Sequence, residues 1–173
     1  MVGLRDRAII ATLVYTAARV GAVAKLERRH FYYAGSQWCL HFDDKGGKSR
    51  EIPVRHDLER YLWEYLDAAG LGDAPPKSPL FRSTVRKEKR LTDQPLSAHA
   101  MCRLVKRRIK DVELPTRLSP HSFRVTTITD LLEQGVPLED VQQLVGHSDP
   151  RTTRLYDRRQ RKVTRNIVER ISI

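Results

Sequence analysis

The segment from residue 118 to residue 156 holds several side chains whose types and order suit phosphate chemistry. It contains a His-x-x-Arg motif (His121 and Arg124), a Gly-His pair that ends at His147, and Tyr156. A guanidinium binds oxyanions through a fork of N–H donors, and an imidazole transfers protons near neutral pH. A tyrosine oxygen can act as a nucleophile and form a covalent intermediate. The segment therefore predicts one half of a phosphate-handling site in which Tyr156 attacks.

The sequence before His121 predicts the helix that positions the His-x-x-Arg motif. Ser119-Pro120 is typical of a helix start, with serine as the N-cap and proline in the first turn. His121 and Arg124 would then share one face near the helix N-terminus, which favours a bound anion.

Further along the chain, residues 138–145 predict a short helix that Gly146 caps, and Asp149-Pro150 begins a helix expected to carry Tyr156. Each residue also has a common structural explanation. A tyrosine on a helix usually packs with its hydroxyl satisfied, and a histidine at a helix end is usually structural.

Two upstream segments could supply further cations. Apolar residues between positions 4 and 20 predict a helix with one buried face, and Gly21 indicates a break before the next helix. Arg19 lies there among small apolar residues, where an arginine is usually a surface residue or half of an ion pair. Residues 37–54 predict a β-hairpin, because two strand-like segments flank a glycine-containing turn, and Pro53 indicates an edge strand.

The hairpin would carry Lys45 and Lys48 at or near its tip. Lysines in turns are usually solvated, and the alternative is a lysine that points at a substrate phosphate. Beyond the hairpin, residues 55–69 predict an amphipathic helix, 70–79 a loop, 84–90 a basic segment in a further loop, and 97–110 a helix capped by Ser97.

The composition favours an anionic partner. The 173 residues include 32 Lys and Arg against 21 Asp and Glu, which gives a net charge of +11 and a pI near 10. Nucleic acid is the simplest such partner, and a basic protein without one is the alternative. Basic side chains that either contact phosphates or form a solvated face are Lys48, Lys87, Lys89, Arg90, Lys106, Arg107, Arg108 and Lys110.

The remaining bulk features indicate one soluble domain, or one compact part of a larger protein, in the cytoplasm. No apolar run approaches membrane-spanning length. Cys39 and Cys102 lie far apart without metal-ligand spacing, so we expect reduced thiols and no metal site.

Four segments together resemble one protein family: TAARVGAVAKL, DDKGGKSREIPV, LSPHSFRVTTITDLLEQG and VQQLVGHSDPRTTRLY. They resemble the catalytic domain of the tyrosine recombinases, the phage integrase family, over essentially the whole chain. The last two segments are highly specific in combination. The resemblance implies a mainly α fold with a small antiparallel β-sheet (α+β). It also implies six catalytic residues, which are Arg19, Lys45, His121, Arg124, His147 and Tyr156.

The chemistry that the resemblance implies is site-specific DNA recombination without metal, cofactor or ATP. Arginines would hold the non-bridging phosphate oxygens while Tyr156 forms a 3′-phosphotyrosyl link. His121 would accept a proton, Lys45 would protonate the leaving 5′-oxygen, and His147 would hydrogen-bond the phosphate. Lys48 is the second candidate for the role of Lys45.

The resemblance also implies partners and context. We expect a double-stranded DNA recombination site, a homo-tetramer on DNA with exchanged C-terminal tails, and a cytoplasmic protein associated with the nucleoid. Residues 1–173 would be the catalytic domain, with the family's separate N-terminal core-binding domain absent. Ala22 and Val125 depart from family members that carry an acidic residue and a histidine there.

Two other functions compete with recombination. One is a type IB topoisomerase-like enzyme that relaxes DNA with the same chemistry. The other is a non-catalytic DNA-binding module, because residues 135–156 resemble a helix-turn-helix.

Overall fold

A computed structural model describes residues 1–43, 49–85, 90–146 and 150–157. Over these ranges the protein is mainly helical with two small antiparallel sheets, which confirms the predicted α+β class. In the described ranges, no helix is both long enough and apolar enough to cross a membrane.

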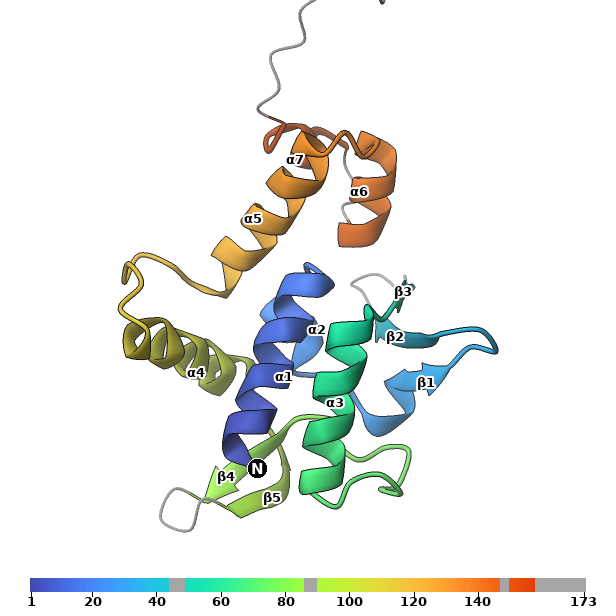
Figure 1. Cartoon of the computed structure of the whole chain (residues 1–173), viewed down its shortest axis with the longest axis vertical. Helices are drawn as coiled ribbons and strands as arrows, with labels where there is room; N and C mark the ends of the chain where they lie inside the picture. Colours follow the sequence, from blue (N-terminus) through green and yellow to red (C-terminus); the bar gives the residue numbers. More distant parts are fainter. Residues whose placement is uncertain (44–48, 86–89, 147–149, 158–173) are drawn as a thin grey trace, which may run out of the picture.

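The first helix is the centre of the molecule. Helix α1 (Val2–Tyr15) lies between α3 (His56–Ala68) and α4 (Ala98–Asp111), with α2 (Val20–Val23) behind it (Figure 1). Ile9 and Leu13 of α1 are completely buried. Because a helix surrounded by other elements loses water on several faces, its apolar burial stabilises the arrangement of all of them.

The three-stranded sheet contains the predicted hairpin. Strands β1 (Phe31–Tyr33), β2 (Trp38–Asp43) and β3 (Ser49–Pro53) pair in the order β1-β2-β3, and a short 3-10 helix, Arg28–His30, precedes β1. Leu40 pairs with Ile52, and both side chains are buried. Strand β3 is an edge, as Pro53 predicted, since proline lacks a ladder donor. The turn with Lys45 and Lys48 lies outside the described residues.

A second hairpin contradicts the loop predicted for residues 84–90 at positions 84–85 and 90, which lie in strands, whereas residues 86–89 are outside the described residues. Strands β4 (Arg82–Val85) and β5 (Arg90–Pro95) pair antiparallel. Their side chains are largely polar and none of them is buried, so the period-two apolar signal of a strand is missing. Tertiary contacts support the hairpin instead: the Arg82 carbonyl accepts a 2.8 Å hydrogen bond from Arg5, and the Leu96 N–H donates to Phe81.

The first helix also ends earlier than predicted. Residues 16–19 separate α1 from α2, and Gly21 lies inside α2 instead of marking the break. The Thr16 hydroxyl donates to the Thr12 carbonyl at 2.6 Å, and Ala17 adopts a left-handed backbone with φ of +47°. A left-handed residue cannot continue a right-handed helix, so the chain changes direction at Ala17.

The last three helices form the upper part of Figure 1: α5 (Pro120–Glu133), α6 (Leu138–Val145) and α7 (Pro150–Arg154). The predicted bounds of α6 are confirmed. The predicted helix after Asp149 is present as α7, but the prediction that it carries Tyr156 is wrong, because α7 ends at Arg154. Tyr156 lies in the turn that follows, and its N–H donates to the Thr153 carbonyl at 3.1 Å.

Candidate active site

Arg124 is the buried arginine that joins three segments of the site. Its side chain is only 3% exposed. Nη1 donates to the carbonyl of Ala17, and Nη2 donates to the carbonyl of Val145 at 2.7 Å. Arg124 therefore connects α5 to the turn between α1 and α2 and to the end of α6. A guanidinium holds its N–H donors in a rigid fork, so these two bonds fix the orientation of the whole group.

Arg19 begins α2 close to the segment that Arg124 holds. It is the N-cap residue of α2, and its carbonyl accepts from Ala22 and Val23 at 2.9 and 3.1 Å. The preceding turn is fixed from within, because the Ala18 N–H donates to the Thr16 hydroxyl. The side chain of Arg19 is exposed. A rigid backbone thus presents this guanidinium at the surface.

His121 lies in the first turn of α5 and is exposed. The Ser119 N–H donates to the Ser122 hydroxyl at 3.1 Å, which confirms the predicted helix start at Ser119-Pro120. The Thr127 hydroxyl donates to the Val14 carbonyl at 2.9 Å and holds α5 against α1. The N-terminus of α5 favours an anion beside His121.

Tyr156 packs against the same small apolar cluster that contains Ala17 and Val145, the two residues whose carbonyls bind Arg124. Its side chain is half-buried, whereas the preceding Leu155 is 83% exposed. Arg124 and Tyr156 are thereby joined through this cluster. Arg19 follows Ala17 by two residues in the same turn. His147 and Lys45 lie outside the described residues.

Arg50 is a residue near the site that the sequence analysis missed. Its Nη1 donates to the carbonyl of Leu144 in α6, and its guanidinium carbon lies 5.5 Å from the centre of the Phe42 ring. The sequence predicts a strand at Arg50 and gives the nearby Lys45 and Lys48, but not Arg50, a functional role. The contact joins residues 94 positions apart, so local sequence carries no signal for it.

The predicted DNA-contacting residues have different surroundings. Lys106, Arg107 and Lys110 of α4 and Arg90 of β5 are exposed. Arg107 also donates to Asp6, at 3.5 Å. Arg108 is less exposed and donates to Asp6 at 2.6 and 3.0 Å and to Asp111 at 3.1 Å. These hydrogen bonds, with Asp6 first, raise the pKa of Arg108. Its charge is therefore largely offset within the protein. Lys48, Lys87 and Lys89 lie outside the described residues.

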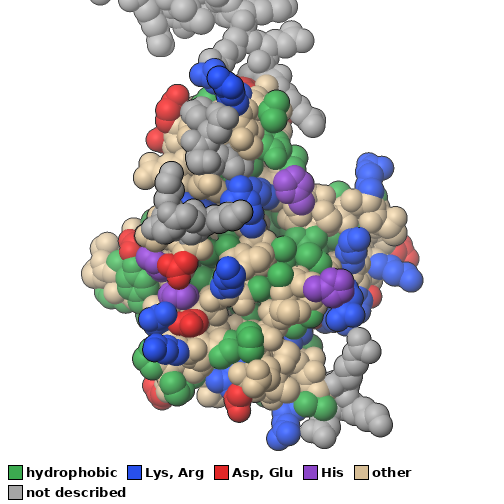
Figure 2. Space-filling view, turned by 180° about the vertical axis from the view of Figure 1, so that it is seen from behind, with side chains coloured by type: hydrophobic (Ala, Val, Ile, Leu, Met, Phe, Trp, Pro, Cys, Tyr) green, Lys and Arg blue, Asp and Glu red, His purple; other side chains and the backbone are tan. Residues whose placement is uncertain are grey.

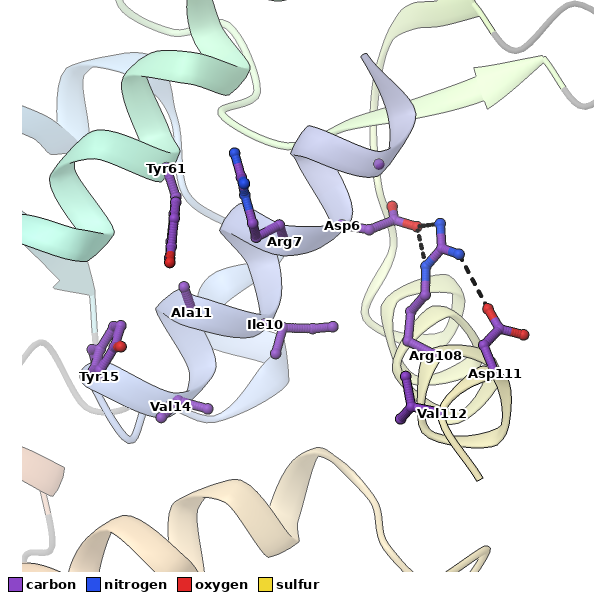
Figure 3. A pocket seen from close by; sticks show the side chains of 11 residues that line it. Asp6, Arg7, Ile10, Ala11, Val14, Tyr15, Tyr61, Arg108, Asp111 and Val112 are labelled. Carbon is purple, nitrogen blue, oxygen red and sulfur yellow. Dashed lines mark hydrogen bonds and ion pairs between the residues drawn. The ribbon is translucent and has the colours of Figure 1, made fainter. Parts of the chain in front are cut away.

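Positive charge is distributed over the surface and is not confined to one helix. On the face in Figure 2, Lys and Arg side chains occur over most of the body, in several places beside a histidine. A hollow of about 490 Å³ lies elsewhere, between α1, α3 and α4, and its lining includes Ile10, Tyr15 and Tyr61 (Figure 3). Arg19, His121, Arg124 and Tyr156 do not line it. Within the described ranges, no three His, Cys, Asp or Glu side chains group as metal ligands.

The fold and the arrangement around Arg124 define the class of protein. Residues 2–162 match the model of the phage integrase family. The chain belongs to this family.

Several curated relatives are tyrosine recombinases. The chain is 34% identical to tyrosine recombinase XerC of Pelobacter propionicus, over 89% of this chain and 47% of the relative. It is 30% identical to tyrosine recombinase XerD of Staphylococcus aureus, over 89% of this chain and 50% of the relative. The chain therefore spans about half the length of these curated relatives.

Solved structures share the fold. A crystal structure of XerA recombinase matches with a TM-score of 0.71 and 22% identity, over 96% of this chain and 54% of that one. XerH site-specific recombinase bound to its difH substrate matches with a TM-score of 0.72 and 24% identity, over 90% and 43%. A lambda integrase dimer bound to a COC′ core site matches with a TM-score of 0.66 and 18% identity, over 93% and 45%.

Proposed function

We propose that this protein is a tyrosine site-specific DNA recombinase and that residues 1–173 form its catalytic domain. The observation that carries the proposal is the position of Arg124. This buried arginine holds the turn before Arg19 and the end of α6, and Tyr156 packs on the cluster to which both of its acceptors belong. Membership of the phage integrase family and relatives named as tyrosine recombinases support the same function.

The proposed reaction is a transesterification. The Tyr156 oxygen attacks phosphorus, a Tyr–O–P bond forms, and the P–O bond to the 5′-oxygen breaks. His121 accepts the tyrosine proton, and Lys45 donates a proton to the 5′-oxygen. Arg19 and Arg124 stabilise the charge that develops on the non-bridging oxygens, and His147 hydrogen-bonds the same phosphate. The phosphodiester energy is retained in the phosphotyrosyl link, so rejoining needs no ATP.

The proposed partner is a double-stranded DNA recombination site. The net charge of +11 supports a polyanionic partner, and two structural relatives are described as bound to a difH substrate and to a COC′ core site. We further propose that four copies assemble on DNA and exchange C-terminal tails, and that the protein acts in the cytoplasm at the nucleoid. Relatives named as recombinases favour this function over the topoisomerase-like and non-catalytic alternatives.

The test is covalent capture of DNA. The protein is incubated with a pool of nicked duplexes of randomised sequence and then denatured. DNA that stays attached to it is sequenced. A nick lets the short 5′-hydroxyl product diffuse away, so the covalent complex accumulates.

We expect attached DNA with the wild type and with the control Tyr33→Phe, which alters an exposed tyrosine of β1, and none with Tyr156→Phe. An adduct that persists in Tyr156→Phe would contradict the assignment of the nucleophile. A wild type that captures no DNA would contradict the proposed activity.

A further inference from the structure

We infer that Arg50 is a positioning residue that locks the β2–β3 hairpin to the C-terminal end of α6. The inference rests on the proposed function, because its consequence is measured on DNA cleavage. Arg50 lies outside the six proposed catalytic positions, and its side chain contacts the end of α6.

The last four carbonyls of a helix have no partner inside the helix, and each needs a donor from elsewhere. In α6 each of the four carbonyls has a donor, and two of them share one. The Gly146 N–H donates to the carbonyls of Gln142 and Gln143, and Gly146 is in a left-handed conformation with φ of +64°. The remaining two carbonyls, of Leu144 and Val145, accept from Arg50 and Arg124 respectively.

The two arginines reach this helix end from different elements. Arg124 comes from α5 and Arg50 from β3. Both place a cation at the negative end of the helix dipole, where positive charge is favourable. Arg124 also holds Ala17 and so belongs to the site itself. Of the two arginines, Arg50 is the one that connects the three-stranded sheet to α6.

Arg50 is well anchored on the hairpin side. It pairs with Phe42 across β2 and β3, and its guanidinium also lies near the Phe42 ring, whose side chain is completely buried in the core. A cation near an aromatic face gains electrostatic attraction and a fixed direction. Strand β3 is at the edge of the described sheet, and the Arg50 side chain reaches the Leu144 carbonyl of α6 directly.

The contact between Arg50 and α6 matters for the proposed reaction because two proposed catalytic residues are close to its ends in the sequence. Lys45 follows β2 and precedes β3, and His147 follows Gly146 directly. Arg50 therefore fixes two described points, β3 and the end of α6, that lie close in sequence to the proposed general acid and the proposed phosphate-binding histidine. Misplacement of a catalytic group by about 1 Å can cost roughly a hundredfold in rate.

The first test measures the link without any activity. Arg50→Met keeps the length of the stem and removes the donors. Arg60→Met is the matched control, because Arg60 is an exposed residue of α3 that pairs with Asp57 and Glu64. We expect faster amide hydrogen exchange at residues 144–146 and 49–53 in Arg50→Met only. Exchange identical to the wild type in these segments would overturn the inference.

The second test measures the consequence on cleavage. It uses the DNA sequence recovered by covalent capture, once with the normal 5′-oxygen and once with sulfur in place of that bridging oxygen. A thiol has a pKa of about 8.5 and leaves as the thiolate, so the sulfur substrate needs no general acid. A structural defect would slow both substrates alike, whereas a displaced general acid slows only the oxygen substrate.

We expect Arg50→Met to slow cleavage of the oxygen substrate by about tenfold or more and to cleave the sulfur substrate within about threefold of the wild-type rate. Arg60→Met should match the wild type on both. Equal slowing on both substrates, or no slowing on either, would overturn the positioning role. If the wild type captures no DNA, the proposed function fails, and the exchange experiment still decides whether Arg50 locks the hairpin to α6.

Discussion

Arg124 is a buried cation with a structural role in addition to the chemical role proposed for it. Burial of a charge costs free energy unless hydrogen bonds replace its water. Here two backbone carbonyls, of Ala17 and Val145, replace part of that water. Both carbonyls belong to backbone that cannot pair regularly, one at a left-handed turn and one at a helix end. The cation and the irregular backbone therefore stabilise each other.

Arg124 and Arg19 should differ in their effect on stability. Arg124→Met leaves two buried carbonyls without their donor, so we expect the free energy of unfolding to fall by about 3 kcal/mol. Arg19→Met alters an exposed side chain and should change it by less than about 0.5 kcal/mol. Urea denaturation measures both values. Both variants should lose covalent capture of DNA, and equal stability of the two would contradict the structural role of Arg124.

At the scale of elements, an ion network attaches α4 to α1. Asp6 of α1 is 2% exposed and accepts from Arg5 at 2.8 Å and from Arg108 of α4 at 2.6 Å (Figure 3 shows the second pair). Arg5 continues the network to the carbonyl of Arg82 in β4. The network therefore fixes α4 and the second hairpin on the central helix, away from the candidate site.

Removal of the charge of Asp6 should destabilise the protein strongly. In Asp6→Asn a buried carboxylate is lost while its arginines remain, so we expect a loss of about 3 kcal/mol in the free energy of unfolding. Asp111→Asn is the control, because Asp111 pairs with the same Arg108 at the surface and should contribute less than about 1 kcal/mol. Chemical denaturation distinguishes them. A similar loss of unfolding free energy in both variants would contradict the larger contribution expected from the buried Asp6.

At the scale of the whole molecule, two apolar clusters share one turn of the chain. The larger cluster includes α1, α3, α4 and the three-stranded sheet, and the smaller one lies in α5 and α6 around Ala17. The turn of residues 16–19 and the guanidinium of Arg124 join them. Because Arg124 and the turn before Arg19 lie where the clusters meet, we expect motion between the clusters to alter the geometry of the proposed site.

The smaller cluster should open more readily than the larger one, because fewer buried side chains hold it. We expect the amides of Val141 and Val145 in α6 to exchange with solvent hydrogen at least roughly tenfold faster than those of Ile9 and Leu13 in α1. Native-state hydrogen exchange measures all four. Equal protection would show that the two clusters unfold as one cooperative unit.

Local sequence determined much of this protein. The hairpin of β2 and β3 was predictable because alternation and a glycine turn coincide, and α6 because apolar spacing ends at a capping glycine. The start of α5 at Ser119 was predictable for the same kind of reason. The family and its candidate residues were also visible, because their motifs lie in short contiguous segments.

Other features were decided only by the tertiary structure. The β4–β5 hairpin has no apolar periodicity, and the end of α7 before Tyr156 has no strong local stop signal. The partners of Arg50, Arg108 and Arg124 lie 94, 102 and up to 107 positions away in the sequence. The local sequence around an arginine does not indicate which distant carbonyl or carboxylate it will bind, because the two groups meet only after the core has packed. The sequence alone thus determined which groups are available for chemistry, and the packing of α1, α5 and α6 decided which of them meet.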